Sequence, residues 1–331
     1  MIHFQKIQNA VLLPLILSIA VVNHAQTRTS AHASEPLTAT ADGQRAAYLA
    51  GLTDVKPGAN GKLFLTSDAV RFEGTNIHAS IPVTQITSVA KGDEHAEKGG
   101  TTGMVVRMLA HYHGGFVIMG PVMQTKVDLL SFEYHDSVGG LHGAVFVLPK
   151  GKASAFEDRL SAQVAPHPVP LAVACSADQA KPDSIQLDPI EAAGIEVPAE
   201  YRLLLYERLL TNLQLRLPVY KFYRAGDITA GRGCMAYSLR ITITGFKKGN
   251  HTLRASTGPI GMFAGVTSLS YRFELKNTSG AVVFTKTLKQ SQRGDRESLN
   301  LTQSIAKNIA KRINKTINPK NSGKSGRAAN A

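Results

Sequence analysis

The sequence has no tryptophan and only two cysteines, Cys175 and Cys234. Cys175 falls in a predicted linker, and so small a number of cysteines argues against a cysteine–histidine nucleophile pair. In an oxidising compartment the two could form one disulfide, which would close a loop of about 60 residues and stabilise the fold by roughly 4 kcal/mol. Spacing alone does not show whether the two side chains meet, so the paired and unpaired states both stay open.

Several catalytic signatures are also missing. There is no Gly-x-Ser-x-Gly elbow and no acidic pair typical of glycoside hydrolysis, and the Ser322–Ser325 segment lacks the strand that precedes a phosphate-binding loop. His111 and His113 would share one face of a strand, and His135 and His142 flank a turn, but no Cys, Asp or Glu joins them at zinc-ligand spacing. We therefore expect a non-catalytic protein without a cofactor, and the alternative is a metal-dependent enzyme.

The first residues predict a targeting segment. Lys6 is followed by a twelve-residue apolar run, Val11–Val22, and then by small residues around Ala25. A membrane-spanning helix needs about 20 apolar residues, so this run indicates a signal peptide over residues 1–25 and export to the bacterial periplasm or beyond. A retained amino-terminal anchor is the alternative. No cysteine lies just after the apolar run, which argues against a bacterial lipid anchor.

Acidic residues are scarce in two stretches that carry the whole formal net charge of +13. From Ser298 to the end there are seven Lys or Arg and no acid, and between Lys221 and Arg254 seven more are opposed by Asp227 alone. A local basic surface favours an anionic partner such as lipid headgroups, an acidic polymer or nucleic acid. Export argues against nucleic acid. The simpler interpretation is a solvated basic face.

The first half of the mature chain predicts a flexible segment followed by short strands. Residues 26–60 are rich in Ala, Thr and Ser and are expected to be flexible, with a short helix as one option at 46–52. Residues 91–98 are expected to form a polar loop. Phe156, Leu160 and Val164 recur every four residues and predict a closing helix over 152–164. The predicted strands are 63–66, 69–73, 77–83, 86–89, 127–134 and 144–148.

A set of strands and turns between Gly61 and Val164 carries a family resemblance. Its parts are Leu63–Phe72, the Ile81–Ile86 corner, the Tyr134–Gly140 turn, Phe146–Pro149 and the closing helix. In this pattern, residues 61–165 resemble a pleckstrin-homology-like (PH-like) domain of the GRAM-related bacterial type. The resemblance implies an antiparallel β-sandwich or barrel with a capping helix, acting as a binding module for lipid headgroups or peptides.

Two features depart from that family. Its lipid-binding members use basic residues in the first strand–turn–strand, whereas here that turn is Ser67–Asp68 with only Lys62 and Arg71 nearby. This argues against a phosphoinositide site. Gly99–Gly120 is an apolar, glycine-rich insertion, which could contact a membrane or partner or form a buried strand or helix of the same domain.

Residues 166–183 are proline-rich at their start and predict a linker to a second domain over 184–317. A strand at 184–188 precedes a helix with Pro198 at its first position, and four further strands follow at about 217–223, 237–245, 266–276 and 281–288. A final helix, with Ser298 as a candidate cap, has one apolar stripe. The fold class expected for the whole chain is therefore α+β, with the second domain a small two-layer α/β unit, and residues 318–331 a disordered basic tail.

Residues 184–315 are similar to an uncharacterised family of exported bacterial α/β domains, for which no activity is implied. Phe246–Gly249, Arg254, the Gly258–Gly265 segment and the Asn277–Gly280 hairpin carry this similarity. The glycines could cradle an anion beside Arg254, or they could simply allow a tight path between strands. The candidate binding residues are Lys247, Lys248, Arg254, Gly258, Gly261, Gly265, Lys307, Lys311, Arg312 and Lys315.

These patterns together predict an exported, non-catalytic binding or envelope-assembly accessory protein. Its partners would be an envelope protein or an anionic lipid surface, and the second domain could form homo-oligomers. The alternative is a peripheral membrane protein that uses the basic final helix and the Gly99–Gly120 insertion.

Overall fold

The computed structural model describes residues 43–97, 124–164, 180–227, 235–249, 266–292 and 299–317. All of these belong to one compact unit. The predicted signal peptide, Ser298, the Gly99–Gly120 insertion and the basic tail lie outside the described residues. None of the helices described is long and apolar enough to cross a membrane.

The first sheet is antiparallel and has the order β4-β3-β2-β1-β7-β6-β5. Two meanders, β1 to β4 and β5 to β7, are joined by the pairing of β1 with β7. A 3₁₀ turn, Val83–Gln85, separates the meanders, and α2 (Ala153–Ser161) follows the last strand and packs against β5 and β6. The strands are β1 Gln44–Ala50, β2 Asn60–Leu65, β3 Ala69–Gly74, β4 Ile77–Pro82, β5 Ile86–Glu97, β6 Gln124–His135 and β7 Leu141–Pro149.

Two expectations for this region are wrong. Residues 44–50, placed in a flexible segment with a short helix as an option, form β1 in the middle of the sheet. The alternation that marks a half-buried strand is missing because β1 is buried on both faces: Ala46 and Tyr48 belong to one core and Ala47 and Leu49 to another. Residues 91–97, predicted as a polar loop, continue β5 at the edge of the sheet, where charged side chains are tolerated.

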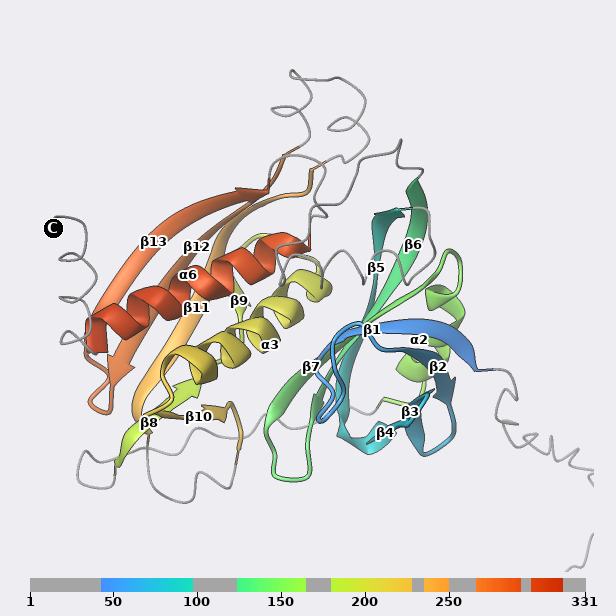
Figure 1. Cartoon of the computed structure of the whole chain (residues 1–331), viewed down its shortest axis with the longest axis horizontal. Coiled ribbons are helices and arrows are strands. Elements are labelled where there is room, and N and C mark those ends of the chain that lie inside the picture. The colour runs from blue at the N-terminus through green and yellow to red at the C-terminus, as the bar shows by residue number, and fades with distance from the viewer. Residues whose placement is uncertain are drawn as a thin grey trace, which may run out of the picture. The chain divides into compact units, whose positions relative to one another are not determined.

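The second sheet is mixed and has the order β10-β8-β11-β12-β13. β8 lies parallel to β10 and β11, whereas β11, β12 and β13 are antiparallel. Helices α3 (Ala199–Arg216) and α6 (Asn300–Ile317) lie side by side over one face (Figure 1). The strands are β8 Lys181–Leu187, β9 Glu191–Ala192, β10 Lys221–Arg224, β11 Met235–Lys247, β12 Thr267–Asn277 and β13 Val282–Gln292, and β9 pairs with β11. The predicted α+β class is confirmed.

Helix α3 belongs to the packing of both sheets. Its apolar residues share one core with Ile241 and Phe273 of the second sheet and with Val145 and Val147 of β7. The alternate residues of β7 point into the other core, beneath α2. Two sheets that the sequence places in separate domains therefore share a buried interface built on α3. The sequence predicts Pro198 as the first residue of this helix, whereas Pro198 is the N-cap and the helix begins at Ala199.

Candidate binding site

The basic residues near the end of β11 are partly engaged within the fold. The ammonium of Lys248 lies 2.8 Å from Oδ1 of Asp93 and 2.9 Å from its carbonyl oxygen, so Lys248 ties β11 to β5 of the first sheet. Lys247 is exposed. The remaining candidates of this region, Arg254, Gly258, Gly261 and Gly265, lie outside the described residues, as do Cys175 and Cys234.

The basic candidates on α6 lie at the surface. Lys307, Lys311 and Lys315 are exposed, whereas Arg312 is half-buried and interacts electrostatically with Tyr271 of β12. The apolar stripe of the same helix is fully buried against the second sheet and α3: it consists of Leu301, Ile305, Ile309 and Ile313. The exposed cations of α6 therefore lie away from its buried apolar stripe.

Two histidines of the first sheet make short polar contacts. His135 Nδ1 lies 2.8 Å from the carbonyl oxygen of Gly139, and His142 Nε2 lies 3.1 Å from Oδ2 of Asp136. Within the described ranges, no three His, Cys, Asp or Glu residues are arranged to hold a metal ion. His111 and His113 are not among the described residues.

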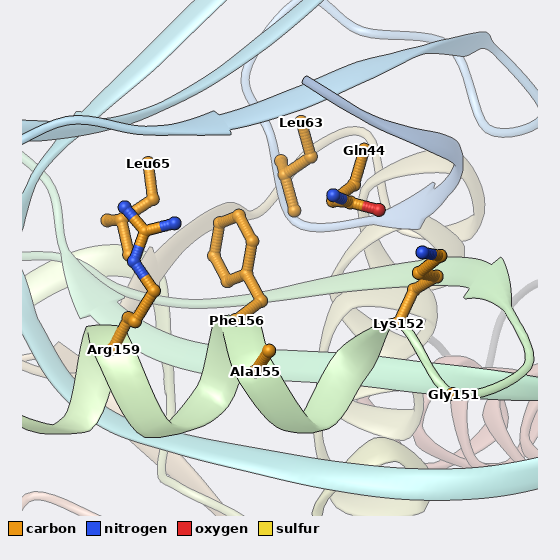
Figure 2. A pocket seen from close by; sticks show the side chains of 8 residues that line it. All are labelled: Gln44, Leu63, Leu65, Gly151, Lys152, Ala155, Phe156 and Arg159. Carbon is orange, nitrogen blue, oxygen red and sulfur yellow. The ribbon is translucent and has the colours of Figure 1, made fainter. Parts of the chain in front are cut away.

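A hollow of about 160 Å³ lies between α2 and the strands β1 and β2 of the first sheet. The ring of Phe156 rises from α2 toward Leu63, with the cationic side chains of Lys152 and Arg159 on either side of it (Figure 2). Lys152 is exposed and Arg159 is half-buried. The lining, all of it from described residues, is completed by Gln44, Leu65, Gly151 and Ala155 and contains no Asp or Glu.

Hydrogen bonds fix the orientation of α2. Asp128 Oδ2 accepts the backbone N–H of Ala153 at 3.0 Å, which anchors the first turn to β6. Glu157 Oε1 accepts the N–H of Lys91 at 3.0 Å, and the Lys91 ammonium donates to Ser154 Oγ at 2.8 Å, which attaches one side of the helix to β5. The side that carries residues 152, 155, 156 and 159 therefore faces the hollow, because these positions recur every three or four residues.

The hollow suits a small anionic group. Its volume equals about five water molecules, well below the roughly 300 Å³ or more of a typical small-molecule site. Lys152 and Arg159 lie seven residues apart, which corresponds to about 10 Å along a helix. A single carboxylate or phosphate on an apolar stem would reach one of these cations while its stem contacts Phe156. The sequence reasoning missed this site because it did not recognise β1, whose Gln44 lines one side.

A second polar cluster lies at the interface between the sheets. Glu207 of α3 accepts hydrogen bonds from both terminal nitrogens of Arg224, at 2.7 and 2.8 Å, and from the N–H of Gly143 at 3.0 Å. Arg224 also donates to the carbonyl oxygen of Leu141 at 2.8 Å. Burial alone would lower the pKa of Arg224, but the carboxylate of Glu207 holds it above its ordinary value. This cluster joins three elements and has a structural role.

Comparisons with known proteins show neither a family nor a function. No protein-family model matches the chain, and no curated protein matches it. Among solved structures, a PelC dodecamer from Paraburkholderia phytofirmans is similar over 42% of this chain and 88% of its own, with 15% identity and a TM-score of 0.29. A DUF330 protein from Xanthomonas campestris is similar over 43% of this chain and 92% of its own, with 10% identity and a TM-score of 0.26. Likenesses this weak carry no argument about this chain.

Proposed function

We propose that the chain is an exported, non-catalytic binding protein that serves as an accessory of envelope assembly. In this proposal the first sheet with α2 is a PH-like binding platform and the second sheet is a docking module. Export is supported by the apolar run Val11–Val22 and the small residues after it. The similarity to exported bacterial α/β domains remains part of the proposal for residues 184–315.

The PH-like interpretation is supported by the order of the strands. A meander of four strands and a meander of three meet through β1 and β7, and a helix follows the last strand and packs across the sheet. Because β1 precedes the strands found in the sequence, the first strand–turn–strand is β1–β2, and its turn runs from Gly51 to Ala59. The scarcity of basic residues around Ser67–Asp68, which argued against a phosphoinositide site, therefore concerns the second turn, between β2 and β3.

The observation that carries the proposal is the hollow beside α2. Lys152 and Arg159 flank Phe156 in a lining that is about as polar as apolar and has no acidic side chain among the described residues. Such a site suits one carboxylate side chain or one phosphate group presented by a larger molecule. A partner macromolecule fits this size better than a free substrate does.

The test is a titration of the mature protein with glutarate and with inorganic phosphate, followed by the backbone amide NMR signals. We expect shifts confined to residues 152–159 and to the facing part of β2, with millimolar dissociation constants typical of single-group ligands. A variant with Lys152→Glu and Arg159→Glu should lose these shifts. A variant with Lys56→Glu and Lys150→Glu, which changes the net charge equally, should keep them. Unchanged signals at α2 in the wild type would refute the proposed site.

Peripheral membrane binding is a second candidate, favoured by the exposed cations of α6 and by Arg45 and Lys62, which lie opposite each other on β1 and β2 and are both exposed. Co-sedimentation with anionic vesicles at low and high salt separates the two candidates, since attraction to a charged surface weakens with salt. Absence of binding at low salt eliminates the membrane function. Because the apolar stripe of α6 is buried, this helix could bind a membrane only through electrostatic attraction of its cationic side chains.

A further inference from the structure

The edge strand β13 presents an open backbone surface. Among the residues that the structure describes, β13 pairs with β12 alone and forms one end of the second sheet (Figure 1). In an antiparallel pair, every second residue directs its N–H and C=O away from the paired strand. β13 is eleven residues long, so these outward groups form an extended row of hydrogen-bond donors and acceptors.

One common means of blocking an edge, a proline, is absent from β13. Its pairing with β12 is regular between Thr267 and Leu275, and one register shift follows between Leu275 and Lys276, near Val282. Val282 and Val283, at the start of the strand, are 49% and 47% exposed. A long and exposed edge of this kind is a template for pairing with another extended segment.

The charges carried by β13 and by α6 are all positive. Lys286 lies opposite Phe273 and so on the face toward α6, whereas Lys289 lies opposite Ser270 on the other face. Neither β13 nor α6 contains an Asp or Glu. Helix α6 packs against β13 and β12, and its Arg312 interacts electrostatically with Tyr271, whose cross-strand neighbour on β13 is Leu288.

These charges select between the occupants that an open strand could accept. If two copies of β13 paired antiparallel with residue 286 opposite residue 286, or residue 289 opposite residue 289, a lysine would face a lysine, which is destabilising. An extended segment with acidic residues spaced three apart would instead place a carboxylate beside Lys286 on one face and beside Lys289 on the other. Backbone pairing and charge complementarity then act together.

We propose that β13 is a β-augmentation site that accepts an extended acidic segment of a partner protein. The proposal deepens the binding function proposed above and rests on it, but it uses a different surface from the hollow beside α2. A variant that changes only one of the two surfaces therefore tests that surface alone.

The experiment uses the full mature chain and a labelled twelve-residue peptide that repeats Glu-Thr-Val four times. We expect binding that weakens about tenfold in the Lys286→Glu, Lys289→Glu variant. Binding should stay unchanged in the Lys56→Glu, Lys150→Glu variant and in the Lys152→Glu, Arg159→Glu variant. Hydrogen exchange of the β13 amides should slow when the peptide binds, because outward N–H groups gain partners. A peptide with alternate amides N-methylated should not bind.

Other outcomes overturn the proposal. Peptide binding without slower exchange in β13 would show attraction by charge alone. If light scattering shows a dimer and the β13 amides are already protected from hydrogen exchange without the peptide, the edge is occupied by a second copy of the chain. Slower exchange in β13 with anionic vesicles but not with the peptide would assign it to a lipid surface. Loss of peptide binding in the Lys152→Glu, Arg159→Glu variant alone would place the peptide in the hollow.

Discussion

Replacing Glu207 with Gln should destabilise the whole protein strongly. The variant keeps the shape of the side chain but leaves the guanidinium of Arg224 as a charge without its carboxylate in a site where the Arg224 and Glu207 side chains are 17% and 9% exposed. Removing one partner of a buried ion pair costs about 3–5 kcal/mol. The cost should appear in global unfolding, because Glu207 contacts both Arg224, at the end of β10, and Gly143 of β7.

The assay is urea unfolding followed by circular dichroism, with the free energy extrapolated to water. A double-mutant cycle with Arg224→Met isolates the pair: the double variant should lose much less than the sum of the two single losses. Glu274→Gln serves as the control, because its two partners, Arg272 and Lys276, are 51% and 27% exposed and each such pair contributes only about 0–1 kcal/mol. Losses that add in the double variant would refute the reasoning.

Two further predictions concern the same interface. Gly143→Ala should cost about 1–3 kcal/mol, since an added Cβ would lie 2.6 Å from Cβ of Leu203, and it should exceed the cost of Gly245→Ala, where the added Cβ would lie 3.3 Å from Cβ of Ser270. Equal unfolding free energies for the two variants would contradict this packing. Burial, followed by the charge of Arg224, lowers the pKa of His142, so below about pH 6.5 the unfolded chain binds a proton more readily than the folded protein. Stability should therefore fall from pH 7 to 5 more steeply in the wild type than in His142→Gln, and parallel profiles would count against it.

The second sheet could be predicted well from the sequence because its strands are buried on one face only. Leu239, Ile241 and Ile243 alternate with polar residues along β11, and the fully buried residues of β12 alternate in the same way. In α3, Tyr201, Leu205 and Leu209 recur every four residues, which predicts the helix. In each case a period in the sequence reflects one buried face.

The first sheet could be predicted only in part, because α3 covers its second face. β1 and β7 are apolar at almost every position, so the pattern of alternation that marks a strand is absent. The contact of α3 with both sheets joins residues far apart in the chain, such as Gly143 and Glu207, and no local pattern indicates it. The hollow was missed for the same reason, since it requires Gln44 of β1 beside Lys152 of α2.

The most direct test of the proposed function is capture of partners from a bacterial envelope extract by the immobilised mature chain. We predict an envelope component that the wild type and the Lys56→Glu, Lys150→Glu control retain, and that the Lys152→Glu, Arg159→Glu variant loses. Retention of the same components by all three proteins would contradict the assignment of the hollow beside α2 as the binding site, and capture of nothing by the wild type would contradict the binding function itself.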